Sequence, residues 1–105
     1  MIATLIAAQI LGTVLSRSGA PQDRADVYLV SVFSGATLKT TVTTHHGSFA
    51  FASLKAGTYG IMVKKGTEAC ALSGALPLTN DHTAVIVLRL RDWSACTGSA
   101  IRFAR

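Results

Sequence analysis

The sequence predicts an all-β protein that folds as a β-sandwich of about seven short antiparallel strands. Several segments alternate polar and apolar residues, and turns rich in Gly, Pro, Asn or Asp separate them. After the first fifteen residues, no segment keeps the 3.6-residue period of an amphipathic helix. Because successive side chains of a strand point to opposite faces, each alternating segment predicts a strand with one buried face. Two packed sheets would bury these faces together.

The composition predicts one domain whose surface carries little charge. The chain has 105 residues, of which 50% are hydrophobic and 14% are charged. Such a surface indicates that some strands are covered on both faces or pack against another molecule. The net charge of +5 is scattered along the chain, whereas a nucleic-acid-binding protein usually gathers its cations on one stripe with aromatic residues between them. The closest cluster is Arg89 and Arg91 on one strand, so we expect no nucleic-acid partner.

The first nine residues, MIATLIAAQ, carry no charge. They lack the positive region at the start of a signal peptide and are too short to span a membrane. We therefore expect residues 1–9 to form an apolar arm in which Ile2, Leu5 and Ile6 are buried on a partner. The arm would add a strand to a neighbour or lie in its groove as a short helix; alternatively, it would fold back on its own domain as an edge strand.

Residues 43–66 show the clearest pattern. After a turn at His46-Gly47, polar and apolar residues alternate from Ser48 to Phe51 and again from Thr58 to Lys64. The two segments predict a β-hairpin with an aromatic core face, and Leu54 is expected to fill the turn between them.

Further strands are expected on either side of this hairpin. They cover residues 10–15, 27–32 and 83–91, with a threonine-rich strand over residues 36–44 and a short edge strand over 76–78. The side chains expected to face inward are Ile10, Val14, Val27, Leu29, Phe49, Phe51, Leu54, Tyr59, Ile61, Val63, Ile86, Leu88 and Leu90.

Some outward-facing positions are also apolar, which is unusual for a sheet that faces water. The strand over residues 27–32 is apolar on both faces, and the outer face of the strand over 83–91 carries Val85 and Val87 beside two arginines, so these apolar outer positions are predicted to contact a partner. Together with the arm, the predicted interaction residues are Ile2, Leu5, Ile6, Tyr28, Val30, Val32, Val85 and Val87.

The central stretch resembles the G-x-F-x-F-x-x-L-x-x-G-x-Y-x-L-x-V core of the carboxypeptidase regulatory-like, or transthyretin-like, β-sandwich domains. Residues 10–15 also resemble the opening I-x-G-x-V of this family. The resemblance implies an Ig-like sandwich over residues 10–91, followed by an extension, residues 92–105, that adds an edge strand or contacts a neighbour. The core pattern is filled by Gly47, Phe49, Phe51, Leu54, Gly57, Tyr59, Ile61 and Val63.

No catalytic site, metal site or cofactor is expected from the polar residues. His45 and His46 are adjacent, and neighbours on a strand point to opposite faces, so they would share a metal only if the turn brought them together. His82 is expected in an exposed turn. The five Asp and Glu residues are expected in loops or at strand ends, and no pair has a spacing that indicates acid–base catalysis.

The two cysteines permit one disulfide. A bond between Cys70 and Cys96 would close a loop of about 27 residues and tie the loop after the hairpin to the C-terminal extension. Two reduced thiols that behave as small buried hydrophobes fit the sequence equally well.

Only some of the proteins that this chain resembles are enzymes. Transthyretin-like hydroxyisourate hydrolases end in Tyr-Arg-Gly-Ser, whereas this chain ends in Ile-Arg-Phe-Ala-Arg. In the carboxypeptidases, the domain is an accessory to the catalytic one. We therefore expect a non-enzymatic structural subunit that assembles with itself or a scaffold on a particle or filament surface, such as a virion decoration protein or an extracellular fibre subunit.

The alternative function is an adhesion or binding module. Such a module would recognise carbohydrate or protein through the loops at one end of the sandwich. It would need aromatic residues in those loops. Trp93 alone qualifies, and a lone tryptophan is more often an anchor for packing.

Overall fold

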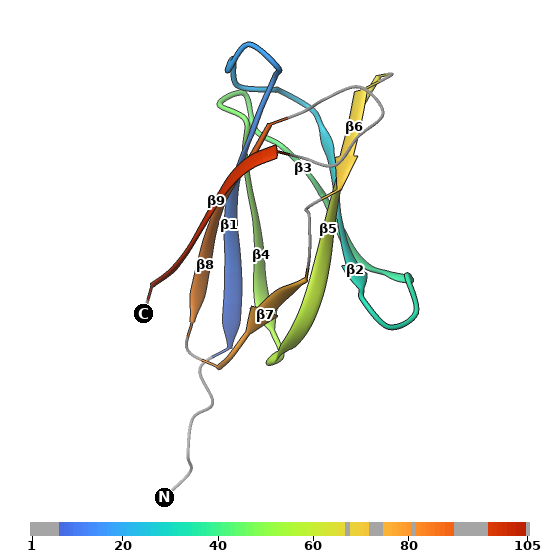
Figure 1. Ribbon diagram of the computed structural model, residues 1–105, viewed down its shortest axis with the longest axis vertical. Coiled ribbons are helices and arrows are strands. Elements are labelled where there is room, and N and C mark those ends of the chain that lie inside the picture. The colour runs from blue at the N-terminus through green and yellow to red at the C-terminus, as the bar shows by residue number, and fades with distance from the viewer. Residues whose placement is uncertain (1–6, 67, 72–74, 81, 90–96, 105) are drawn as a thin grey trace, which may run out of the picture.

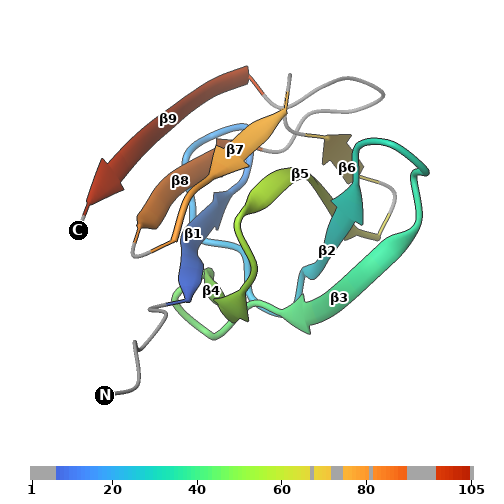
Figure 2. The same ribbon diagram turned by 90° about the horizontal axis from the view of Figure 1, so that it is seen from below.

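The computed structural model describes residues 7–66, 68–71, 75–80, 82–89 and 97–104. Nine strands and no helix are found in this part of the chain. None of the described residues therefore belongs to a helix long and apolar enough to cross a membrane. The strands form two sheets that pack face to face (Figures 1 and 2). The predicted all-β sandwich is confirmed.

Sheet A has the strand order β4-β1-β8-β9. Its strands are β1 (Ala8–Leu15), β4 (Ser48–Leu54), β8 (Thr83–Arg89) and β9 (Thr97–Ala104). The pairs β1–β4 and β8–β9 are antiparallel, but β1 and β8 run parallel to each other. The sandwich thus contains one parallel pair among strands that were all expected to be antiparallel. Of the two roles expected for the C-terminal extension, residues 97–104 take that of an edge strand.

Sheet B has the strand order β3-β2-β5-β6. Its strands are β2 (Asp26–Ser31), β3 (Thr37–Val42), β5 (Gly57–Lys65) and β6 (Glu68–Ala71). The short strand β7 (Leu76–Leu78) pairs with the first residues of β5, while β6 pairs with its last residues. The edge strand predicted over residues 76–78 is therefore present.

β4 and β5 do not form the predicted hairpin. β4 pairs with β1 in sheet A, and β5 pairs with β2 in sheet B, so the link between them crosses from one sheet to the other. The prediction was wrong because alternation determines which side chains of a strand are buried, but not which strand lies beside it. The two aromatic faces still meet in the core, from opposite sheets.

A β-bulge at the end of β4 prepares this crossing. Register pairs change from Ile10–Phe51 to Ala8–Leu54, so β4 holds one residue more than β1, and Ser53 has a positive φ of 57°. The extra residue turns Leu54 inward, although strict alternation from Phe51 would point it outward. Tyr59 then closes the corner, because its hydroxyl donates a hydrogen bond to the Lys55 carbonyl at 2.6 Å.

The core contains the side chains that the alternation predicted. All of the predicted inward-facing residues among those described are buried, except that Tyr59 is half-buried against the core; Leu90 lies outside the described residues. Ala8 is also fully buried and pairs with Leu54. Gln9 pairs with Thr83 and donates its backbone N–H to the His82 carbonyl at 3.1 Å. Strand β1 therefore begins two residues before the expected boundary, and Ala8 and Gln9 belong to the sandwich rather than to the arm.

Candidate interaction surfaces

The predicted interaction residues lie on two opposite outer faces of the sandwich. Tyr28 and Val30 are on the outer face of sheet B, whereas Val85 and Val87 are on the outer face of sheet A. Ile2, Leu5 and Ile6 lie outside the described residues. The described residues of the predicted set therefore form two separate surfaces.

The outer face of sheet B carries an apolar area that we call the outer-face patch, formed by Tyr28, Val30, Val32 and Met62. Tyr28 lies opposite Met62 in the register of β2 and β5, and Val32 follows the end of β2. Met62 is 47% exposed and Val32 41%, while Tyr28 and Val30 are half-buried. The patch thus leaves apolar surface exposed on a sheet face that none of the described strands covers (Figure 2).

Glycine explains part of the burial on this face. Val30 lies opposite Gly60, and a Cβ atom on Gly60 would be only 2.8 Å from Val30 Cγ2. The valine side chain therefore lies across the glycine and shields itself within its own sheet. Beside it is an open groove of about 300 Å³, lined by Tyr28, Val30, Gly35, Thr37, Met62, Val63, Lys64 and Ala69.

The outer face of sheet A is a second, more polar surface. Val85 and Val87 are half-buried in the middle of the sheet, between β1 and β9. Leu11, which lies opposite both Ala50 and Val85, is 39% exposed. A groove of about 560 Å³ extends from this face past the β4 edge to the end of β3 in sheet B, and four hydroxyl-bearing residues are in its lining: Leu11, Gly12, Thr13, Thr41, Val42, Thr44, Ser48, Phe49, Ala50 and Val85.

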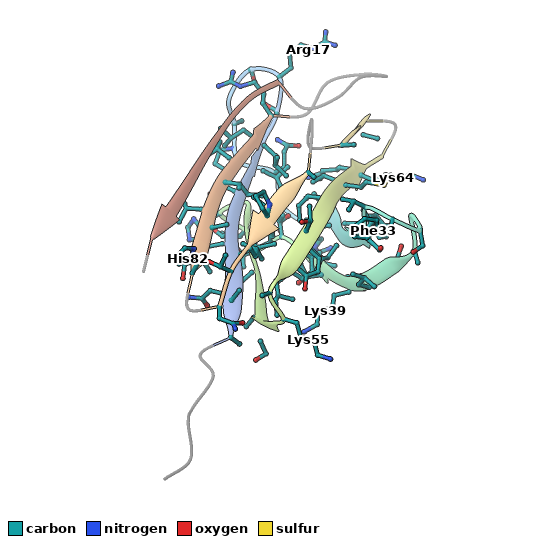
Figure 3. All side chains as sticks on the ribbon, turned by 60° about the horizontal axis from the view of Figure 1, so that its bottom comes forward. Arg17, Phe33, Lys39, Lys55, Lys64 and His82 are labelled. Carbon is teal, nitrogen blue, oxygen red and sulfur yellow. The ribbon has the colours of Figure 1, made fainter. Side chains whose placement is uncertain are left out.

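Phe33 is a surface residue that the sequence analysis missed. It lies in the loop between β2 and β3, and 92% of it is exposed (Figure 3). It was overlooked because it directly follows the apolar second strand, although the Ser34-Gly35 turn beside it could have placed it in a loop. Trp93, the loop aromatic that the sequence suggested, lies outside the described residues.

The loop that carries Phe33 is tied together by hydrogen bonds. Ser31 accepts the Gly35 N–H on its carbonyl at 2.8 Å, and its own N–H donates to the Ala36 carbonyl at 2.9 Å. Its hydroxyl oxygen accepts the N–H groups of Phe33 at 3.3 Å and Ser34 at 3.4 Å. Gly35 completes the turn with a φ of 71°, which suits glycine. Phe33 is therefore held in water by an ordered turn.

The histidines lie in turns. His45 and His46 are exposed, and their ring centroids are 5.0 Å apart, edge to face. His82 is half-buried rather than exposed, and its Nδ1 is hydrogen-bonded to the Thr79 hydroxyl. In the part of the chain that the structure describes, no three His, Cys, Asp or Glu side chains gather in a way that could hold a metal ion.

The cysteine pairing stays a prediction. Cys70 belongs to β6, whose backbone pairs it with Val63. Cys96 lies outside the described residues.

Two solved structures share the fold of this chain. The 5-hydroxyisourate hydrolase of Klebsiella pneumoniae is 17% identical, with a TM-score of 0.63 over 98% of this chain and 100% of that chain. An (S)-allantoin synthase is 14% identical, with a TM-score of 0.59; the match covers 99% of this chain and 46% of the synthase. At these identities the likeness shows a transthyretin-like fold, and the activities named belong to those proteins. Comparison with curated protein sequences finds no match.

The family is shown by a different comparison. The profile of the carboxypeptidase regulatory-like domain matches residues 9–91, which include every strand from β2 to β8 and nearly all of β1. The matched stretch contains the aromatic pattern of β4 and β5 and the glycine of β1. The chain therefore belongs to the carboxypeptidase regulatory-like domain family.

Proposed function

We propose that this domain is a non-catalytic structural subunit that assembles with copies of itself or with a scaffold on the surface of a particle or filament. A virion surface and an extracellular fibre are the two settings that suit it best. The observation that carries the proposal is the outer-face patch, where Met62 and Val32 stay substantially exposed beside an apolar groove. An apolar patch of this kind marks a protein contact more often than a free surface.

The shape of the patch supports close packing by another subunit. Its groove is bordered by Gly35 and Ala69, whose small size lets a partner approach the backbone. A side chain from the partner could fill the groove while Met62, which is long and unbranched, adapts to it. A typical stable interface buries about 800 Å² on each partner, so the patch would be the centre of a contact that also includes polar residues around it.

The family supports a role without catalysis. The matching profile describes a regulatory-like domain rather than a peptidase. A small accessory sandwich of this type contributes contacts. The apolar arm was expected from the sequence over residues 1–9; because Ala8 and Gln9 belong to β1, residues 1–6 would add the further contacts to a neighbour.

Sedimentation velocity over a range of protein concentrations tests the proposal. The parent chain should associate as its concentration rises. Met62→Lys places a charge in the middle of the patch and should raise the dissociation constant at least tenfold, since a buried unpaired charge costs more than one tenfold step in affinity. Ala20→Lys is the matched control, because Ala20 is exposed in the loop between β1 and β2, away from both outer faces. Its association should equal that of the parent.

The alternative function, an adhesion or binding module for carbohydrate or protein, is favoured by Phe33. An exposed aromatic side chain on an ordered loop is a typical anchor for recognition. A parent chain that stays monomeric at every concentration would contradict self-assembly and leave this module as the better explanation.

A further inference from the structure

One end of the sandwich gathers apolar and basic side chains that the proposed assembly does not use. We call it the loop end; it carries the β2–β3 loop, the crossing from β4 to β5, the turn before β8, and Ala7, which directly precedes β1 (Figure 1). Figure 3, in which this end comes forward, labels Phe33, Lys39 and Lys55 there, with Arg17 at the far end.

The apolar part of the loop end belongs to one hairpin. Phe33 is 92% exposed in the turn, and Leu38, near the start of β3, is 51% exposed. Because Ser31 holds the turn through its hydroxyl and its backbone, Phe33 would lose little backbone freedom on entering an apolar phase.

The basic part lies next to this hairpin. Lys39, Lys55 and Leu38 line one hollow of about 220 Å³ between β3 and the β4–β5 crossing. Lys39 Nζ donates to the Ala52 carbonyl at 3.1 Å, which keeps its charge at this end of the molecule. Both lysines are exposed. Two positive charges therefore lie on the side of the apolar hairpin that faces the β4–β5 crossing.

Negative charge is placed elsewhere among the described side chains. Asp23 and Asp26 lie at the opposite end, where Asp26 begins β2 and is in register with Lys64 near the end of β5. Asp81, next to Asn80 in the sequence, lies outside the described residues. A second copy of this chain would bring the same lysines to the contact, so like charges disfavour a contact between two loop ends.

We propose that the loop end docks on an anionic membrane surface. Phe33 enters the boundary between headgroups and acyl chains, and Leu38, on the strand that follows the turn, lies at the membrane surface. Lys39 and Lys55 keep their ammonium groups at the level of the lipid phosphates and carboxylates. An exposed apolar tip with cations behind it is the arrangement that binds anionic bilayers, because apolar burial and charge attraction add. A neutral carbohydrate or a neutral protein pocket would not use the two lysines.

Co-sedimentation with vesicles tests this. The full chain is mixed with phosphatidylcholine vesicles that do or do not contain phosphatidylserine, and the partition coefficient is measured at several salt concentrations. The chain should bind the vesicles with phosphatidylserine, and salt should weaken the binding. Phe33→Ser should lower the partition coefficient about tenfold to a hundredfold. Lys55→Gln should lower it about fivefold and reduce the dependence on salt.

Leu11→Ser is the matched control, because it removes an exposed apolar side chain from the outer face of sheet A. Its partition coefficient should equal that of the parent. Phe33→Trp should give a partition coefficient equal to or higher than that of the parent, since tryptophan suits the membrane interface.

Absence of binding to phosphatidylserine vesicles would overturn the proposal, as would equal binding by Phe33→Ser. A Phe33-dependent complex with a protein or a polysaccharide in place of vesicles would also overturn it. Met62→Lys, which tests assembly, leaves the loop end intact, so the two proposals fail independently.

Discussion

At the scale of single residues, the closest fit in the core is between Gly12 and Phe49. They face each other across β1 and β4, and the phenyl ring lies directly over the glycine: a Cβ atom on Gly12 would be 2.0 Å from Phe49 Cζ. The ring is nearly buried and lies edge to face with Phe51, whose centroid is 5.8 Å away. It therefore has little room to move aside.

Gly12→Ala should destabilise the domain by about 1–3 kcal/mol, the usual cost of overpacking a core. Thermal and urea denaturation would measure it. Gly57→Ala is the matched control, because the nearest atoms that a Cβ there would meet are Tyr59 atoms at 3.8 Å, an ordinary contact. Combining Gly12→Ala with Phe49→Leu should cost less than the sum of the two single changes, since the shorter side chain makes room for the methyl group. Strictly additive effects would contradict this contact.

At the level of strands, the polar–apolar alternation correctly predicted which side chains face the core, but it did not predict which strands lie beside one another. It gave the correct inward side chains for β2, β4, β5 and β8 because each strand has its own period of two. It could not distinguish a hairpin from a crossing between sheets, since both put Phe51 and Ile61 in the core. The parallel contact of β1 with β8 joins strands about 70 residues apart, and no local pattern encodes such a pair.

The surface residues show the same contrast between what one strand determines and what depends on the neighbouring strand. The outward positions of Tyr28 and Val30 were predictable from their strand, whereas the packing of Val30 over Gly60 depends on the register between β2 and β5. To predict that Phe33 is exposed, one must know where β2 ends, and alternation determines strand ends poorly.

The loop between β1 and β2 depends on one buried hydroxyl group. Thr43 Oγ1 accepts the Ala25 N–H at 2.8 Å and donates to the Gln22 carbonyl at 2.6 Å, and Thr43 is only 4% exposed. The Thr43 carbonyl also accepts the N–H of Arg24, which has a positive φ of 56°. The threonine thus holds the loop on the sandwich next to a backbone conformation that is uncommon for arginine.

Thr43→Val should cost about 1–3 kcal/mol, because it leaves the buried Ala25 N–H and the partly buried Gln22 carbonyl without their partner while keeping the shape of the side chain. Thr43→Ser keeps the hydroxyl and loses one methyl group, which should cost about 1 kcal/mol or less. Thr40→Val, at an exposed position of β3, should be close to neutral. Urea denaturation ranks the three variants, and equal midpoints for Thr43→Val and Thr43→Ser would show that the hydroxyl does not hold the loop.

For the whole molecule, the boundary between the N-terminal arm and the sandwich lies between Ala7 and Ala8. Ala8 is buried and Gln9 is half-buried, and Gln9 Nε2 donates to the Thr83 hydroxyl at 3.0 Å, whereas Ala7 is exposed. Removing residues 1–8 would therefore damage β1 as well as the arm. Removing residues 1–6 leaves the strand intact and separates the two roles.

If residues 1–6 are an assembly arm, the chain that lacks them should keep the circular dichroism spectrum and melting temperature of the parent but associate more weakly in sedimentation velocity. The reason is that Ile2, Leu5 and Ile6 would otherwise be buried on a neighbour, and each apolar side chain contributes about 1.5–3 kcal/mol when fully buried. Replacing these three residues by serine in the full chain should have the same effect, because it removes the apolar surface without shortening the chain. An arm that folds back on its own domain would give the opposite pattern, a lower melting temperature with unchanged association. Normal association together with normal melting would show that residues 1–6 serve neither role, and assembly would then depend on the outer faces alone.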